Sequence, residues 1–511
     1  MKLRIGSTGL LPLVVGALLG FVRPAQADAG ACLAEARLVS AEQFLEQVRG
    51  AQDYLAAIDA PVIDREVVAA GREVVGRGRG RHGRQRVVRR ERQVALFRRI
   101  SIRAYDECDG TLHTIAVRVP HPLPGQDGPK RPRGAKAGAA TFAFTTLTPG
   151  YQVTYQGGLG VARLKFAVSR DGRPLTVLAM RHPRIPSSAW RSRDPRLLED
   201  ARAAVYSAYQ PEFHGRPFTD GLIAAGVRRW LADIAGALGA LDESGARSFA
   251  FPDERLARLW PPEALLMLGT IEQSDDGAFR DDPRHTAEAV AIEYALNPRP
   301  FYFANSSANA IGPYQFTDKG KGSRPGTYTS MVRRCADARL APSFERGARD
   351  LQNSMRAAVC LLDLELARMP EDALRLFRED YRLGATYAVA AYNAGGRQSA
   401  KLYDEVPPDA LAEAARALDL PLKAFQYRKA VAHRRQRHAT RMLVNNETRG
   451  YLLKMFVTWD IVDEWMAHAP LSTADAPAAA EPPDATSPPG AEDQPADAPL
   501  AEPADTPPAK P

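Results

Sequence analysis

The sequence predicts a mainly α-helical domain at residues 249–468, preceded by a smaller α+β domain at residues 28–248. Two patterns carry this prediction. Between Thr141 and Leu178, apolar and polar residues alternate with the two-residue period of a β-strand. From Pro261 onward, apolar residues recur at helical spacing and strand patterns largely vanish. A chain of 511 residues is long enough for two or three domains that each bury a core.

Residues 1–27 have the pattern of a signal peptide. Basic residues precede an apolar run from Leu10 to Val22, and Ala25–Ala27 supplies small residues for cleavage. The run is too short to span a bilayer stably, so we expect an exported, periplasmic protein, with a retained membrane anchor as the alternative. Lipid attachment at Cys32 is a further alternative, although Ala29–Ala31 lacks the large aliphatic residue of a bacterial lipoprotein signal.

An exported protein meets an oxidising compartment, where cysteines form disulfides. The chain has four cysteines, and sequence alone permits three pairings. We favour Cys32 with Cys108 and Cys335 with Cys360, because each pair would then lie inside one predicted domain. Neither a CxxC motif nor the Cys/His spacing of a zinc site occurs, so we expect no metal and no cofactor.

The α+β region begins with an expected helix near residues 41–58 and then carries a strongly basic run. Between Arg72 and Arg99 there are eleven arginines, against only Glu73 and Glu91. Such a run attracts polyanions. For an exported protein, the candidates are an anionic wall polymer, a membrane surface or a secretion-machinery partner, and nucleic acid is not expected. The alternative is a solvated, partly disordered loop around Gly76–Arg81.

Regular elements are expected after this run. Alternation predicts strands at residues 141–145, 151–155, 162–168 and 174–178, with a hairpin turn at 170–172. Helical spacing and end signals predict helices from about 261 to 271, 351 to 369, 385 to 393 and 447 to 465. Residues 469–511 are rich in proline and acidic residues and contain no aromatic residue, which predicts a disordered tail.

Glu272 is the first candidate for catalysis. It follows Leu265 and Leu268 at spacings of seven and four, so it continues an apolar helix stripe. A carboxyl group in a partly apolar cleft has a raised pKa and can donate a proton near neutral pH. On helix position alone, the simpler alternative is a glutamate that turns to solvent or pairs with an arginine.

Four motifs in a fixed order favour the catalytic interpretation of Glu272 over this simpler alternative. They are Glu272–Ser274 with Phe279, Ala310–Phe316, Ala390–Gly396 and Glu447–Tyr451. Together they resemble the ordered motifs of soluble lytic transglycosylases related to goose-type lysozyme. The resemblance covers about Trp260 to Trp465 and implies a lysozyme-like fold for the catalytic domain.

The resemblance implies an enzyme that cleaves peptidoglycan glycan strands between N-acetylmuramic acid and N-acetylglucosamine and leaves a 1,6-anhydro ring. Glu272 would be its general acid and base. Gly312 would let the backbone approach the glycan, and Gln315 would offer a donor and an acceptor to an N-acetyl group. The complete set of expected substrate-binding residues is Ser274, Gly312, Gln315, Tyr392 and Asn393.

One departure keeps two other functions open. The family usually has serine directly after the glutamate, whereas Gln273 stands there in this chain. The first alternative is a muramidase, which hydrolyses the same bond with a second carboxylate, from Asp275, Asp276, Asp281 or Asp282, activating water. The second is a non-catalytic scaffold for cell-wall binding or secretion assembly.

Overall fold

The computed structural model describes residues 40–80, 83–121, 144–157, 165–184, 202–209, 214–302, 304–306, 309–320, 325–405, 407–408 and 446–468. The chain divides into two compact units, residues 1–470 and 471–511, and every described residue belongs to the first. The predicted signal peptide, Cys32 and the predicted tail therefore lie outside the described residues. Among the helices that are described, none is both long and apolar enough to cross a bilayer.

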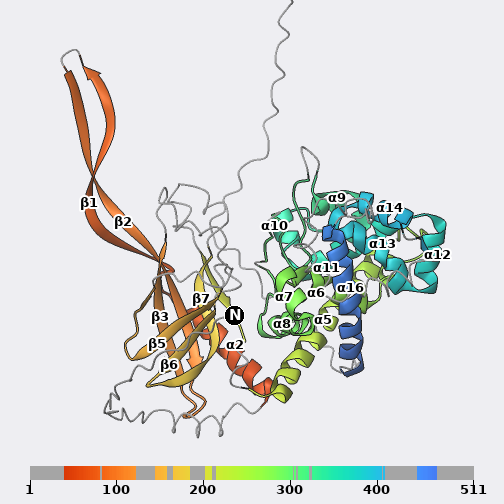
Figure 1. Ribbon diagram of the computed structural model, residues 1–511, viewed down its shortest axis with the longest axis horizontal. Helices are drawn as coiled ribbons and strands as arrows, with labels where there is room; N and C mark the ends of the chain where they lie inside the picture. Colours follow the sequence, from red (N-terminus) through yellow and green to blue (C-terminus); the bar gives the residue numbers. More distant parts are fainter. Residues whose placement is uncertain are drawn as a thin grey trace, which may run out of the picture. The chain divides into compact units, whose positions relative to one another are not determined.

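A nearly closed, antiparallel sheet of eight strands dominates the N-terminal part (Figure 1). Its order is β4-β3-β2-β7-β6-β5, with β1 also paired to β2 and β8 to β7. The strands are β1 (Ile63–Gly80), β2 (Gly83–Tyr105), β3 (Leu112–His121), β4 (Thr145–Thr146), β5 (Tyr151–Gly157), β6 (Lys165–Arg170), β7 (Arg173–Arg184) and β8 (Arg202–Tyr206).

This sheet overturns the predicted fold class. A mainly α, lysozyme-like protein with a smaller α+β domain was expected, and that prediction is wrong because the eight-stranded sheet is a major part of the fold. The error comes from the basic run, where arginine and glycine interrupt the apolar pattern of β1 and β2. Residues 76–80 pair with β2, so the alternative of a disordered loop is wrong for the described part of Gly76–Arg81.

The strands predicted after the basic run agree more closely with the structure. β5 and β7 cover the predicted runs 151–155 and 174–178, and β6 covers 165–168 of the run 162–168, whose first three residues lie outside the described residues. The β6–β7 hairpin turns at Asp171 and Gly172, both with positive φ. Of the first predicted run, residues 141–143 lie outside the described residues, and Thr145 begins the short strand β4. The sheet buries its own core, with Ile100 and Ile102 of β2 alternating toward it.

Helix α2 (Ala41–Ala57) links the sheet to the helices. Ser40 caps its N-terminus by accepting a hydrogen bond from the Gln43 amide. In its interior, the buried Gln52 side chain donates to Ser207 Oγ at 2.8 Å and to the Leu296 carbonyl at 2.9 Å. One amide group thus joins α2 to the residue after β8 and to the end of α8.

The C-terminal part is helical. All four predicted helices are confirmed, as α6, α11, α13 and α16. The described helices are α5 (Arg216–Ser244), α6 (Pro262–Gln273), α7 (Asp276–Asp281), α8 (Pro283–Leu296), α9 (Thr327–Arg334), α10 (Phe344–Gly347), α11 (Leu351–Leu366), α12 (Glu371–Glu379), α13 (Tyr381–Ala394), α14 (Gly396–Glu405) and α16 (Asn446–His468).

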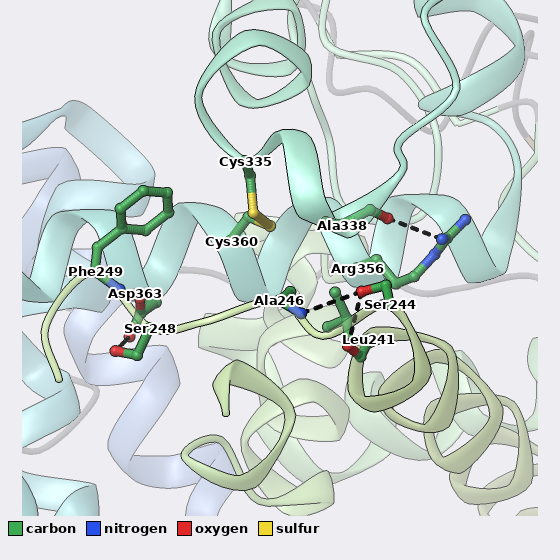
Figure 2. Close-up of a disulfide and its surroundings, with 10 residues drawn as sticks. All are labelled: Leu241, Ser244, Ala246, Ser248, Phe249, Cys335, Ala338, Arg356, Cys360 and Asp363. Atoms are coloured by element: carbon green, nitrogen blue, oxygen red, sulfur yellow. Dashed lines mark hydrogen bonds between the residues drawn. A yellow bond between two sulfur atoms is a disulfide. The ribbon is translucent and has the colours of Figure 1, made fainter. Parts of the chain in front are cut away.

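A disulfide fastens the end of α9 to α11 (Figure 2). Cys335 and Cys360 are bonded, as predicted. One turn further along α11, the buried Asp363 accepts hydrogen bonds from Ser248 Oγ and the Phe249 amide, which ties the segment after α5 to the same helix. Cys108 is also disulfide-bonded, and its predicted partner Cys32 lies outside the described residues.

Candidate active site

Helix α6 holds Glu272 where a buried helix reaches the surface. Every residue from Ala264 to Ile271 is buried, and Pro262 lies in the first turn, where proline is tolerated. Gly269 permits close packing, because a Cβ there would lie 2.4 Å from the Trp230 ring. Since α6 is packed against other elements on nearly all sides, the half-buried Glu272 in its last turn has a fixed position.

The carboxyl group of Glu272 is held by α16. Tyr451 donates its hydroxyl hydrogen to Glu272 Oε1. Burial raises the pKa of Glu272 to about 7, and the Tyr451 hydrogen bond and the charge of Lys454 only partly oppose this rise. A carboxyl with that pKa is protonated in a large fraction of molecules at neutral pH, which is the state a general acid needs.

Lys454 lies one turn beyond Tyr451 and anchors the chain that follows α6. Its Nζ donates to the Ser274 carbonyl at 2.9 Å and to Asp276 Oδ1 at 3.1 Å. The ammonium lowers the pKa of Glu272 while the Asp276 carboxylate raises it, so this ion pair partly cancels its own effect on the site. Burial therefore remains the main cause of the raised pKa.

The predicted loop at Gly312 packs directly beside α6. Gly312 has a φ of 80°, and a Cβ there would lie 1.8 Å from the Ala348 carbonyl oxygen, so only glycine fits. Gln273 Nε2 donates to the carbonyls of Gly312 at 3.2 Å and Pro313 at 2.6 Å. Gln273, the departure from the family pattern, thus fastens this loop next to Glu272.

Gln315 closes the same turn. It has a φ of 51°, in the left-handed region, and its Nε2 donates to the Gly312 carbonyl at 2.8 Å. Its Oε1 can still accept a hydrogen bond, and the side chain is held in place by the turn. The role expected for Gln315, contact with an N-acetyl group, stays a prediction.

Tyr392 and Asn393, at the end of α13, contact the Gly312 loop and α16, respectively. Tyr392 donates to the Tyr314 carbonyl at 2.7 Å. Burial raises the pKa of Tyr392 well above its ordinary value, and the nearby charge of Glu272 adds to this rise. Asn393 Oδ1 lies 3.3 Å from Thr448 Oγ1, which donates to it from α16.

The structure thus gathers most, but not all, of the predicted site. The loop of Gly312 and Gln315 accepts hydrogen bonds from Gln273, next to Glu272, and from Tyr392. The buried Ser274 side chain instead donates back to the Thr270 carbonyl at 2.6 Å. Ser274 therefore offers its hydroxyl to its own helix.

The sequence reasoning named neither Tyr451 nor Lys454 as a site residue. Tyr451 belongs to the Glu447–Tyr451 motif, and that was the signal available for it. Lys454 follows Tyr451 by three positions, which is the spacing of neighbours on one helix face. A search of that face for polar residues would have found Lys454.

The acidic residues after Glu272 have other partners. Asp275 caps α7 by accepting from the Gly277 and Ala278 amides, and Asp282 caps α8 by accepting from the His285 amide. The exposed Asp276 is the ion-pair partner of Lys454. Three of the four carboxylates that were candidates for activating water therefore have structural roles, and only Asp281 has none among the described contacts.

One group of possible metal ligands lies elsewhere, in the described β2–β3 turn. Asp106, Asp109 and His113 bring ligand atoms within 4.8 Å of one another. However, both His113 ring nitrogens already have partners, Tyr151 Oη at 3.0 Å and Thr111 Oγ1 at 2.8 Å.

Comparison of the chain with family models, with curated proteins and with solved structures found no match.

Proposed function

We propose that this protein is a peptidoglycan lytic transglycosylase, exported to the periplasm, with Glu272 as its acid and base. The observation that carries the proposal is the state of this carboxyl group. Burial raises its pKa to about 7, Tyr451 orients it, and the buried helix α6 fixes its position. The ordered motifs around it in the sequence are the second support.

In the proposed reaction, Glu272 first gives its proton to the glycosidic oxygen between N-acetylmuramic acid and N-acetylglucosamine. The muramic N-acetyl group assists departure of the leaving sugar, which removes the need for a second carboxylate. The ionised Glu272 then takes the proton of the muramic C6 hydroxyl. That oxygen attacks the anomeric carbon and closes the 1,6-anhydro ring.

The surroundings of Glu272 favour this reaction over hydrolysis. A hydrolase would need a second carboxylate that is free to activate water, at a separation set by its mechanism. Asp275 and Asp282 are engaged as helix caps and Asp276 pairs with Lys454, so Asp281 is the remaining candidate among the described carboxylates after Glu272. A substrate-assisted reaction needs none of them.

The contacts of Gln273 remove the main argument for the scaffold alternative. Its place after the glutamate was the departure that favoured a non-catalytic role. In the structure, Gln273 donates to two carbonyls of the Gly312 loop, so it contributes to the site. A scaffold also has no use for a buried carboxyl group with a raised pKa, which costs folding free energy.

The test is mass spectrometry of muropeptides released from purified peptidoglycan. We expect anhydromuramic products from the wild type and none from Glu272→Gln. Glu371→Gln, which removes an exposed glutamate from the first turn of α12, is the matched control and should release the same products as the wild type. Reducing ends in place of anhydro ends would indicate a muramidase, and no release by the wild type would favour the scaffold.

A further inference from the structure

The hairpin of β1 and β2 runs on past the rest of the sheet. β3 pairs with residues 96–105 of β2, and β7 pairs with residues 101–105. Residues 83–95 of β2 pair with β1 and with no other described strand. Figure 1 shows this part as a long, twisted, two-stranded ribbon. A two-stranded ribbon has marginal stability by itself in water, so a partner surface would stabilise it.

The register divides the ribbon into two unlike faces. Because successive strand residues alternate between faces, the even-numbered positions of β2 from Arg84 to Leu96 and their partners on β1 share one face of the ribbon. This face, which we call the arginine face, contains no acidic residue. Its arginines are Arg65, Arg72, Arg77, Arg79, Arg84, Arg86, Arg90 and Arg92.

The opposite face has the reverse composition. We call it the acidic face, and it contains one arginine, Arg89, which is paired in register with Glu73. Its acidic residues within the same stretch are Glu66, Glu73 and Glu91. Charge segregation of this kind is a property of the register and is hidden in the sequence, where Arg89, Arg90 and Glu91 are neighbours. The register therefore places most arginines of the ribbon on one face.

Three rows of the arginine face set like charges directly opposite each other. The register pairs Arg72 with Arg90, Arg77 with Arg86 and Arg79 with Arg84. Directly opposed like charges destabilise a strand pair. The destabilisation disappears when an anionic surface lies over the face. Arginine is suited to phosphate because its planar guanidinium binds phosphate oxygens in pairs, and residues 65–96 contain no lysine.

Apolar rows on the same face distinguish between anionic partners. Val74 pairs with Val88, and Val67 with Val94, between the arginine rows. A soluble anionic polymer offers nothing to these rows. The interface of a phospholipid bilayer can bind both the arginine rows and the valine rows, since its headgroups bind cations and its acyl boundary takes up apolar residues.

We propose that the arginine face of the β1–β2 ribbon binds the surface of an anionic phospholipid membrane. The proposal is independent of the enzymatic one, because the ribbon and Glu272 belong to different parts of the fold. Glu272→Gln should therefore bind membranes as the wild type does. Each arginine near an anionic bilayer contributes about a fivefold increase in partitioning, which weakens as salt is added.

The test is co-sedimentation of the full chain with vesicles of phosphatidylcholine alone or with added phosphatidylglycerol. The measured quantity is the ratio of the two partition coefficients, since the apolar run at Leu10–Val22 contributes to both. Arg90→Gln and Arg89→Gln make the matched pair. They are neighbours, they lose the same charge, and they lie on opposite faces.

We expect Arg90→Gln to lower the ratio about fivefold, Arg72→Gln/Arg90→Gln to lower it further, and Arg90→Lys to restore most of it. Arg89→Gln should leave the ratio near that of the wild type. Equal losses in the two single variants would reduce the effect to net charge and overturn the proposal. A wild-type ratio near one would overturn it as well, and so would binding to a soluble polyphosphate without binding to vesicles.

Discussion

Tyr451 donates a hydrogen bond to the carboxyl group of Glu272 across 179 positions of sequence. The tyrosine lies in α16 and the glutamate in the last turn of α6, two helices that pack together. Lys454, one turn along α16, holds the chain just after α6. One face of α16 therefore both orients the carboxyl group and adjusts its pKa.

Tyr451→Phe should raise the pKa of Glu272 above about 7, because the lost hydrogen bond stabilises the carboxylate. Asp276→Asn should move it slightly the other way, since the Asp276 charge raises this pKa and the group is exposed. A ¹³C NMR titration of the glutamate carboxyls measures both shifts without any substrate. An unchanged or lowered pKa in Tyr451→Phe would contradict the geometry.

Glu272→Gln should stabilise the protein at pH 8 and leave its stability unchanged near pH 4. The folded state holds the proton more tightly than the unfolded state, so the wild type loses stability as pH rises from about 4.5 to about 7. The full difference corresponds to about 3 kcal/mol as an upper value. Urea unfolding of both proteins at the two pH values measures it, and equal stability at pH 8 would show that the carboxyl is well solvated.

Gly312→Ala should destabilise the protein by about 2–4 kcal/mol and displace the Gln315 loop. Its φ is 80° and the new Cβ would lie 1.8 Å from the Ala348 carbonyl oxygen. Gly150→Ala is the matched control, because its φ of 84° is similar but nothing lies within 4 Å of its Cβ. That variant should lose only about 1 kcal/mol by thermal unfolding. Equal losses would mean that backbone strain alone matters at Gly312.

Removing the disulfide with Cys335→Ala/Cys360→Ala should lower the free energy of unfolding by about 3 kcal/mol, as expected for a bond that closes a separation of 25 residues. The raised pKa of Glu272 should persist, since α6 and α16 do not contain either cysteine. Denaturant unfolding measures the first effect and the NMR titration the second. A changed Glu272 pKa would show that the crosslink also shapes the site.

Several features could be predicted because they depend on near neighbours in sequence. The helices α6, α11, α13 and α16 follow from apolar spacing and end signals, and the hairpin at Asp171 and Gly172 follows from turn chemistry. The position of Glu272 on an apolar stripe predicted its raised pKa, because burial follows from helical periodicity. The Cys335–Cys360 bond was favoured by domain membership alone.

The sequence by itself determined the helices, the late hairpin and the candidacy of Glu272, since each depends on residues within one or two turns of each other. Only the tertiary structure decided that Tyr451 binds Glu272, that Gln273 holds the Gly312 loop and that Ser274 faces its own helix. It also decided that the basic run joins an eight-stranded sheet with most of its arginines on one face. These features depend on strand register and helix packing, which are fixed by contacts between segments far apart in the chain.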